Sequence, residues 1–171
     1  MNTIFLSKPL RQVVTDIPAS GDEVCIPEEL AHFPDVLFVF VRHVGCPFAE
    51  RDIKFSNTWA AEHTDVAVVI VTHGNIAVRD AWLEVVGGAE NLHFYHDPER
   101  MLYGRFGLGY SSAWHFMGPA SLWGVVSLWR KGIRNRMASG TRWQRAGVFH
   151  VRHGRLIWRA IPQSAEMFKL P

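Results

Sequence analysis

Apolar runs and amphipathic stretches alternate through the first two thirds of the chain. Three runs rich in β-branched and aromatic residues show little polar alternation, which is typical of strands buried on both faces of a parallel sheet: 36–43, 66–72 and 92–95. The segment after each run carries helix start and stop signals, which predict helices over about 48–62, 76–86 and 98–106. This order of elements predicts a parallel sheet with right-handed crossovers.

The end of the chain has a different pattern. Residues 146–152 and 155–161, separated by a two-residue turn, predict an antiparallel hairpin. A short edge strand at 23–26 and a short terminal helix at 163–170 are also expected. Together these elements predict an α/β fold with a central mixed sheet flanked by helices, and the length of 171 residues fits a single domain.

A Trp-rich insert at about 107–145 precedes the hairpin and holds four of the seven Trp residues, Trp114, Trp123, Trp129 and Trp143. Pro119 begins a predicted helix, whose inward face at helical spacing comprises Leu122, Val126, Trp129 and Ile133. Basic residues cluster at its end, namely Arg130, Lys131, Arg134 and Arg136. Three interpretations remain open: a lid over the sheet edge or Cys46 with Trp inside and Arg outside, an oligomer interface, or a surface for nucleic acid or lipid headgroups.

Composition narrows the class of protein. The chain is 48% apolar and 20% charged, which are ordinary globular values and exclude wholesale disorder. Two Cys residues are too few for a disulfide scaffold or a four-thiolate zinc site. The insert is too interrupted by Gly and Pro to cross a membrane, so no stable membrane insertion is expected. Since residues 1–14 contain no apolar signal segment, we expect a cytoplasmic, reducing location.

The net charge of +2 conceals an uneven distribution. Residues 1–106 contain 8 basic and 15 acidic side chains, a net of −7, whereas residues 107–171 contain 10 basic and one acidic side chain, a net of +9. Because the chain is too short for two domains, a domain boundary near residue 106 does not explain this uneven charge. If the insert folds over the first half, its positive charge would surround the groups that it covers.

The segment 42–49, Arg-His-Val-Gly-Cys-Pro-Phe-Ala, carries the clearest chemistry. It places Cys46 after a buried strand and at the first turn of a helix, where unpaired N–H groups and the helix dipole favour a thiolate. Arg42 supplies a cation, His43 a hydrogen-bond donor, and Pro47 stiffens the helix start without an unused N–H group. The competing interpretation is a buried Cys that acts only as a small apolar residue.

With these motifs the chain resembles the thioredoxin fold, and more narrowly the peroxiredoxin-like proteins of the alkyl hydroperoxide reductase/thiol-specific antioxidant (AhpC/TSA) group. The resemblance covers about residues 36–161 and rests on three motifs, at 40–48, 122–127 and 143–149. It implies that Cys46 is the redox thiol, which attacks a peroxide and becomes a sulfenic acid. It also implies a separate Arg that holds the thiolate and the peroxide, for which Arg42 and Arg145 are both candidates.

The chain departs from that group at three positions. Where relatives have a Thr three residues before the Cys, this chain has His43, and an upstream Pro is replaced by Val39. Many relatives have a second Cys where this chain has Ala49, so no disulfide can form within the motif. A resolving thiol must then come from Cys25, from another subunit or from a small thiol such as glutathione. Cys25 is alternatively a buried filler in its predicted strand.

Metal and cofactor signals are weak. His93 with His96, and His150 with His153, are three apart across strand ends, where side chains point to opposite faces. His73 lies in a turn at a strand end, where ligands of α/β sheets often bind, although a plain turn is the favoured interpretation. No dinucleotide or P-loop motif is present in the sequence. We expect no metal and no cofactor.

The sequence therefore predicts a thiol-dependent oxidoreductase in which Cys46 reduces a peroxide or disulfide and an external thiol, thioredoxin- or glutathione-like, recycles it. The site would comprise Cys46, Arg42, His43, Pro47 and Arg145, with Cys25 as a possible resolving thiol. A homodimer is possible, and no nucleic-acid partner is expected. Two alternatives remain: a catalytically degenerate thioredoxin-fold module that binds or regulates, and an anion-binding protein that acts through its basic cluster.

Overall fold

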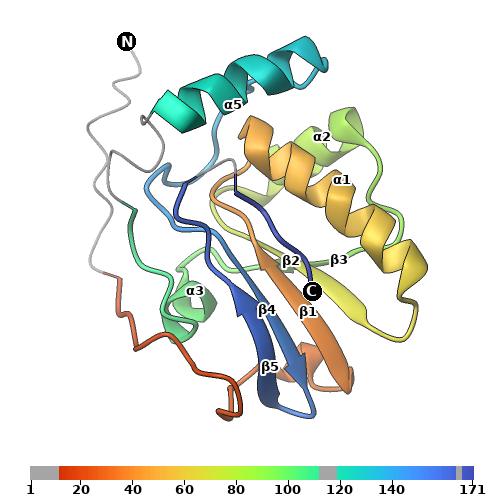
Figure 1. Cartoon of the computed structure of the whole chain (residues 1–171), viewed down its shortest axis with the longest axis vertical. Coiled ribbons are helices and arrows are strands. Elements are labelled where there is room, and N and C mark those ends of the chain that lie inside the picture. Colours follow the sequence, from red (N-terminus) through yellow and green to blue (C-terminus); the bar gives the residue numbers. More distant parts are fainter. Residues whose placement is uncertain (1–11, 112–118, 165–166) are drawn as a thin grey trace.

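The computed structural model describes residues 12–111, 119–164 and 167–171, apart from the side chains of 120–122 (Figure 1). A short 3₁₀ turn, η1 (Glu28–Leu30), precedes the sheet. The strands are β1 (Asp35–Phe40), β2 (Ala67–Thr72), β3 (His93–His96), β4 (Gly147–Arg152) and β5 (Arg155–Ala160). The helices are α1 (Pro47–Glu62), α2 (Ile76–Val86), α3 (Met101–Arg105) and α5 (Pro119–Arg130).

The described strands form one mixed sheet in the order β3-β2-β1-β4-β5. The βα units place β1, β2 and β3 parallel, and the hairpin adds β4 and β5 antiparallel on the other side of β1. The central residue Phe38 pairs with Val69 on one side and Phe149 on the other. The predicted mixed α/β sheet with a closing hairpin is therefore confirmed.

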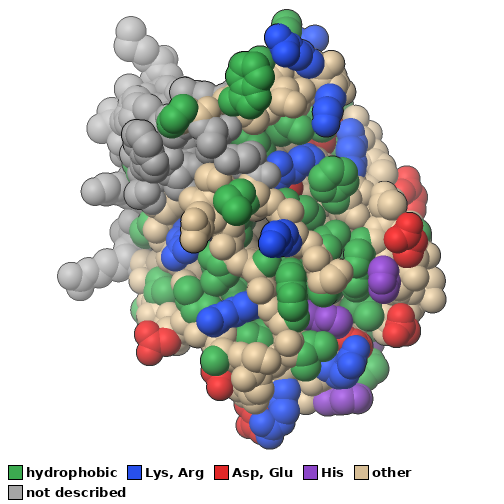
Figure 2. All heavy atoms as spheres, viewed as in Figure 1, with side chains coloured by type: hydrophobic (Ala, Val, Ile, Leu, Met, Phe, Trp, Pro, Cys, Tyr) green, Lys and Arg blue, Asp and Glu red, His purple; other side chains and the backbone are tan. Residues whose placement is uncertain are grey.

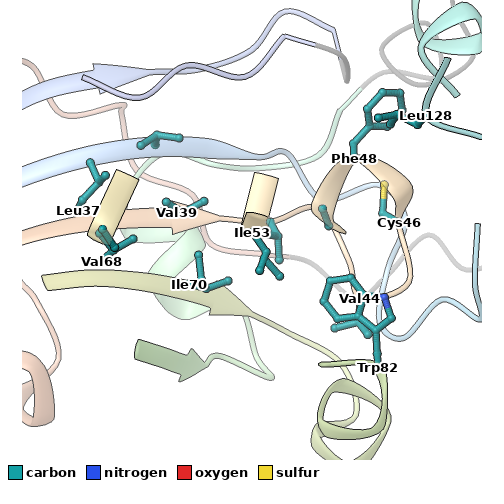
Figure 3. Packing of buried hydrophobic residues seen from close by; sticks show 14 of the residues in the cluster. Leu37, Val39, Val44, Cys46, Phe48, Ile53, Val68, Ile70, Trp82 and Leu128 are labelled. Carbon is teal, nitrogen blue, oxygen red and sulfur yellow. The ribbon is translucent and has the colours of Figure 1, made fainter. Parts of the chain in front are cut away.

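Alternate residues of the central strands build a core on each face of the sheet. Leu37, Val39 and Ile70 face α1 and α2, where they pack with Ile53 and Trp82 (Figure 3). The intervening residues face α3 and pack with its aromatic side chains; this second set includes Phe38, Phe40, Val71, Tyr103, Phe106 and Phe149. Burial on both faces explains why these strands lack polar alternation.

Several predicted elements differ from the structure. The first strand ends at Phe40, so that residues 41–45 leave the sheet as a loop. The predicted edge strand at 23–26 is reduced to an isolated bridge between Glu23 and Arg155. The prediction of a terminal helix at 163–170 is wrong as well, since the described residues of this range are irregular.

The third predicted helix begins later than expected because Asp97 binds its first N–H groups. The Asp97 carboxylate accepts hydrogen bonds from Met101 N at 2.9 Å, Leu102 N at 2.7 Å and Tyr103 N at 3.1 Å. The backbone at Arg100 takes a left-handed conformation, with φ of 60°, which stops helical geometry from extending back to Pro98. The carboxylate therefore stabilises a short helix that starts at Met101.

The insert helix α5 starts at Pro119 as predicted and lies against α1, but with another face inward (Figure 1). Leu128 is buried in the core that contains Cys46, and Val125 and Ile133 are partly buried against that core. Trp129 and Val126, which were expected inside, are exposed. The expectation of a lid with its Trp residues inside is thus wrong for Trp129 and Trp123, while Trp114 lies outside the described residues.

Candidate functional site

Cys46 occupies the N-cap position of α1. Its backbone is extended, its carbonyl accepts the first helical hydrogen bond from Glu50 N at 3.1 Å, and Pro47 takes the first helical position. The side chain is buried, close to Phe48 and Leu128 (Figure 3). The loop after β1 and the proline together fix the thiol at a helix start, where the helix dipole favours negative charge, but the sulfur makes no capping hydrogen bond to the helix.

The end of the insert covers this loop through backbone contacts. We call residues 136–140 the covering segment. Arg136 N donates to Gly45 O at 3.0 Å, and Ser139 N donates to Val44 O at 3.3 Å. Gly45 has a φ of +84°, and a Cβ at this position would lie 2.9 Å from the carbonyl carbon of Met137. The close approach therefore depends on a glycine directly before Cys46.

The covering segment also joins the loop after β2. Asn75 N donates to Ser139 Oγ at 2.7 Å, and a Cβ on Gly74 would lie 2.6 Å from Gly140 N. Both loops leave the carboxyl ends of parallel strands, which meet at one edge of the sheet. The segment thus bridges the two loops at the edge where ligands of α/β sheets commonly bind.

Arg42 brings a buried guanidinium close to the thiol. Its Nη2 donates to Arg142 O at 3.0 Å, and the side chain is only 7% exposed. Burial lowers the pKa of Arg42, while negative charge at Cys46 opposes that shift. Even a lowered arginine pKa leaves the group charged at neutral pH, so Arg42 places a positive charge near Cys46.

His43 is buried next to Arg42 and is neutral. Burial, and to a smaller extent the charge of Arg42, lower the pKa of His43 to about 3. Its Nδ1 lies 2.9 Å from Val44 O, which can only accept, so the proton is on Nδ1. In this tautomer Nε2 is an acceptor, and the hydrogen bond of His43 supports the loop rather than the sulfur.

Two further buried groups lie at this site: His73, for which the sequence favoured a plain turn, and Asp52, which no pattern in the sequence singled out. His73 Nε2 donates to Arg42 O at 2.6 Å, and burial lowers the pKa of His73 to about 4. Asp52 is buried on α1, and burial raises the pKa of Asp52 to about 7 even though Arg51 Nη2 lies 2.6 Å from its Oδ1. Negative charge at Cys46 contributes to this rise in the pKa of Asp52, so Asp52 and the thiol influence one another.

A cavity of about 590 Å³ lies between α1, β4, β5 and the C-terminal segment. Its walls are mainly aromatic and aliphatic, with Phe48, Ala49, Val148, Trp158 and Phe168 among them. Charged side chains also line it: Arg42, Asp52, Arg159 and Lys169. Since Phe48 and Ala49 follow the thiol within one helical turn, the cavity adjoins the start of α1.

The second candidate cation, Arg145, is half-buried, and its backbone N donates to Gly109 O at 3.0 Å. Arg142, rather than Arg145, lies close enough for its positive charge to lower the pKa of both Arg42 and His43. The sequence offered no basis for choosing Arg142, because its position depends on how the insert returns to the sheet.

Cys25 is exposed, which corrects its interpretation as a buried filler. Its sulfur lies 3.7 Å from Arg105 Nη1, and Val24 N donates to Gly154 O at the hairpin turn. That turn lies beside the start of β1, whereas Cys46 follows its end. The six residues of β1 span about 20 Å, and a disulfide requires Cα atoms within about 7 Å. The fold therefore does not bring these thiols together.

The described residues contain no group of three His, Cys, Asp or Glu side chains that could hold a metal ion. The His150 ring, considered above as a ligand, lies 2.5 Å from Asp35 Oδ1 in a pair that joins β4 to β1. In the same described part of the chain, no helix combines the length and apolar character needed to span a membrane.

The sheet order, the parallel βα units and the thiol at the first turn of α1 define a thioredoxin-like α/β protein. Solved structures share this fold. A peroxiredoxin-like protein from Aquifex aeolicus matches with a TM-score of 0.59 and 14% identity, over 90% of this chain and 82% of that chain. Peroxidoxin BcpB from Mycobacterium tuberculosis matches with a TM-score of 0.59 and 11% identity, over 86% and 88%. A thiol peroxidase from Chromobacterium violaceum matches with a TM-score of 0.55 and 14% identity, over 91% and 83%.

The chain belongs to the AhpC/TSA antioxidant enzyme family, whose model matches residues 54–164. This membership supports a thiol-dependent redox function in general terms. No curated protein matches the sequence. The family match begins eight residues after Cys46, so the role of that thiol is inferred from its position in the fold.

Proposed function

We propose that the protein is a thiol-dependent peroxidase with Cys46 as its reactive thiol. The observation that carries the proposal is the position of Cys46 at the N-cap of α1, beside the buried guanidinium of Arg42. Both groups favour the thiolate, which is the nucleophilic form. The adjoining cavity provides space for the organic part of a peroxide, and the family membership supports a redox role.

The reaction proceeds in two stages. The Cys46 thiolate attacks one peroxide oxygen, the O–O bond breaks, and the leaving alkoxide or hydroxide takes up a proton, which gives a sulfenic acid and an alcohol or water. An external thiol then attacks the sulfenic sulfur and releases water, and a second external thiol resolves the mixed disulfide. External thiols are needed because Ala49 replaces the local partner and Cys25 lies near the other end of β1.

Substrate must reach a thiol that is only 3% exposed. Simple accessibility therefore predicts that iodoacetamide alkylates the exposed Cys25 faster than the buried Cys46. The proposed activation predicts the reverse order at pH 7, measured by peptide mass spectrometry. Faster labelling of Cys25 would contradict the activation of Cys46.

The decisive experiment compares wild type, Cys46→Ser and the matched control Cys25→Ser in peroxide consumption with an external thiol. We expect Cys46→Ser to fall to the uncatalysed rate and Cys25→Ser to retain wild-type turnover. A sulfenic acid trapped at Cys46 after a brief peroxide pulse would identify the intermediate. Turnover that persists in Cys46→Ser refutes the proposal.

The burial of Cys46 supports a second candidate function, a catalytically inactive module that binds a ligand in the cavity of about 590 Å³. Such a module would lack peroxide turnover in the wild type. The same measurements therefore distinguish the two functions.

A further inference from the structure

The helix α5 presents an exposed apolar row on the side away from its buried Leu128. Trp123, Val126 and Trp129 are spaced three residues apart and are 68%, 42% and 57% exposed. Residues at this spacing lie on neighbouring parts of one helix surface. Two Trp side chains at such exposure are unusual in a soluble protein unless they meet a partner or an interface.

The apolar row is bordered by cations at the end of the helix. Arg130, Lys131 and Arg134 are exposed, and the Arg134 guanidinium lies 5.2 Å from the Trp129 ring centre. The insert at 107–145 contains no acidic residue. Figure 2 shows hydrophobic and basic side chains gathered over α5, at the top of the view. We call Trp123, Val126, Trp129, Arg130, Lys131 and Arg134 the α5 patch.

We propose that the α5 patch binds the surface of an anionic lipid bilayer. Trp side chains favour the interfacial region of a membrane, where the ring is partly buried and its N–H group stays hydrated. Flanking Lys and Arg side chains meet the negative headgroups. Both features occur together on the described surface of α5 and the residues just after it, while the other side of α5 is held against α1 through Leu128.

Two other occupants fit the patch less well. A symmetric dimer through this face would bring two basic inserts together, with no acidic side chain in the insert to offset their repulsion. A nucleic acid would use the cations, but its phosphate backbone does not require an exposed Trp-Val-Trp row. An anionic bilayer uses both components of the patch.

The test is vesicle co-sedimentation of the full chain, with phosphatidylcholine vesicles and with vesicles that also contain phosphatidylglycerol. We expect binding only to the anionic vesicles, and a steep decrease as salt is raised. The double variant Trp123→Ser/Trp129→Ser should bind at least about tenfold more weakly. The triple variant Arg130→Ser/Lys131→Ser/Arg134→Ser should lose on the order of a hundredfold.

The matched control is Val85→Ser, which removes an equally exposed apolar side chain from α2 and should bind as wild type. Each single Trp variant is measured as well, in case the double variant does not fold. Equal binding of wild type and the Trp variants overturns the proposal, as does absence of binding to anionic vesicles. A dimer that the Trp substitutions abolish, or oligonucleotide binding with no vesicle binding, also overturns it.

Discussion

Replacing Gly45 by alanine tests whether the covering segment holds the thiol loop through direct backbone contact. Gly45 has a φ of +84°, in the left-handed region that disfavours side chains. A Cβ there would lie 2.9 Å from the carbonyl carbon of Met137 and closer still to its oxygen, so the covering segment must move. Gly132→Ala is the matched control, because Gly132 has a φ of +82° with nothing within 4 Å of a Cβ.

The two substitutions share the cost of a left-handed alanine, about 1–2 kcal/mol. Only Gly45→Ala also disrupts the hydrogen bonds from Arg136 N at 3.0 Å and Ser139 N at 3.3 Å. Two backbone hydrogen bonds contribute about 1–3 kcal/mol together. We therefore expect Gly45→Ala to lower the free energy of unfolding by about 1–3 kcal/mol more than Gly132→Ala does.

Urea unfolding of both variants gives the difference in free energy, and iodoacetamide labelling of Cys46 reports local opening. Labelling of Cys46 should accelerate in Gly45→Ala and remain at the wild-type rate in Gly132→Ala. If both variants unfold at the same urea concentration and label Cys46 equally, the covering segment does not hold the thiol loop.

Two further predictions concern buried charge. Burial lowers the pKa of His43 to about 3 and of His73 to about 4. Below about pH 6.5 these two histidines take up protons in the unfolded chain but not in the folded one. Each therefore lowers the free energy of unfolding by about 1.4 kcal/mol per pH unit as the pH falls toward 4. Burial raises the pKa of Asp52 to about 7, so Asp52 stabilises the fold by about 1.4 kcal/mol per pH unit over the same fall in pH and offsets one of the two histidines. The Asp52→Asn variant should therefore show about twice the wild-type dependence of unfolding free energy on pH, measured by urea unfolding. In a separate test, Asp97→Ala should lower the free energy of unfolding by about 2–3 kcal/mol, because three N–H groups of α3 lose their acceptor. The control Asp80→Ala, at an exposed position, should leave the free energy of unfolding unchanged in the same assay.

The strands could be predicted because burial on both faces leaves a direct trace in sequence. The run that begins at Val36 has apolar side chains at successive positions, and the structure divides them between two cores. The thiol position was equally readable, since a strand, a glycine and Cys-Pro define a helix start by local geometry alone.

The orientation of α5 could not be predicted, because its sequence carries two apolar rows. One contains Val126 and Trp129, and the other contains Val125 and Leu128. Helical spacing identifies both rows but does not indicate which one meets α1. The structure buries Leu128 and leaves the Trp-containing row exposed, a result that depends on tertiary docking.

Asp52 was missed for a related reason. A charged residue in a polar helix is normally solvated, and the adjacent Arg51 strengthens that impression. Asp52 lines the same cavity as β5 and the C-terminal segment, which come together with α1 only in the folded chain. These partners lie about 100 residues away in the chain, where local patterns carry no information.

The uneven charge distribution is explained by pairing between the two parts of the chain. Arg152 Nε lies 2.6 Å from Asp35, Arg155 Nη2 lies 2.6 Å from Glu23, and Arg136 Nε lies 3.9 Å from Glu50. Each pair joins a base after residue 106 to an acid before it. Because such partly exposed pairs contribute little stability, their main effect is to favour the correct packing of the hairpin and insert. Of the remaining cations, Arg142 acts on Arg42 and His43, and Arg130, Lys131 and Arg134 belong to the α5 patch.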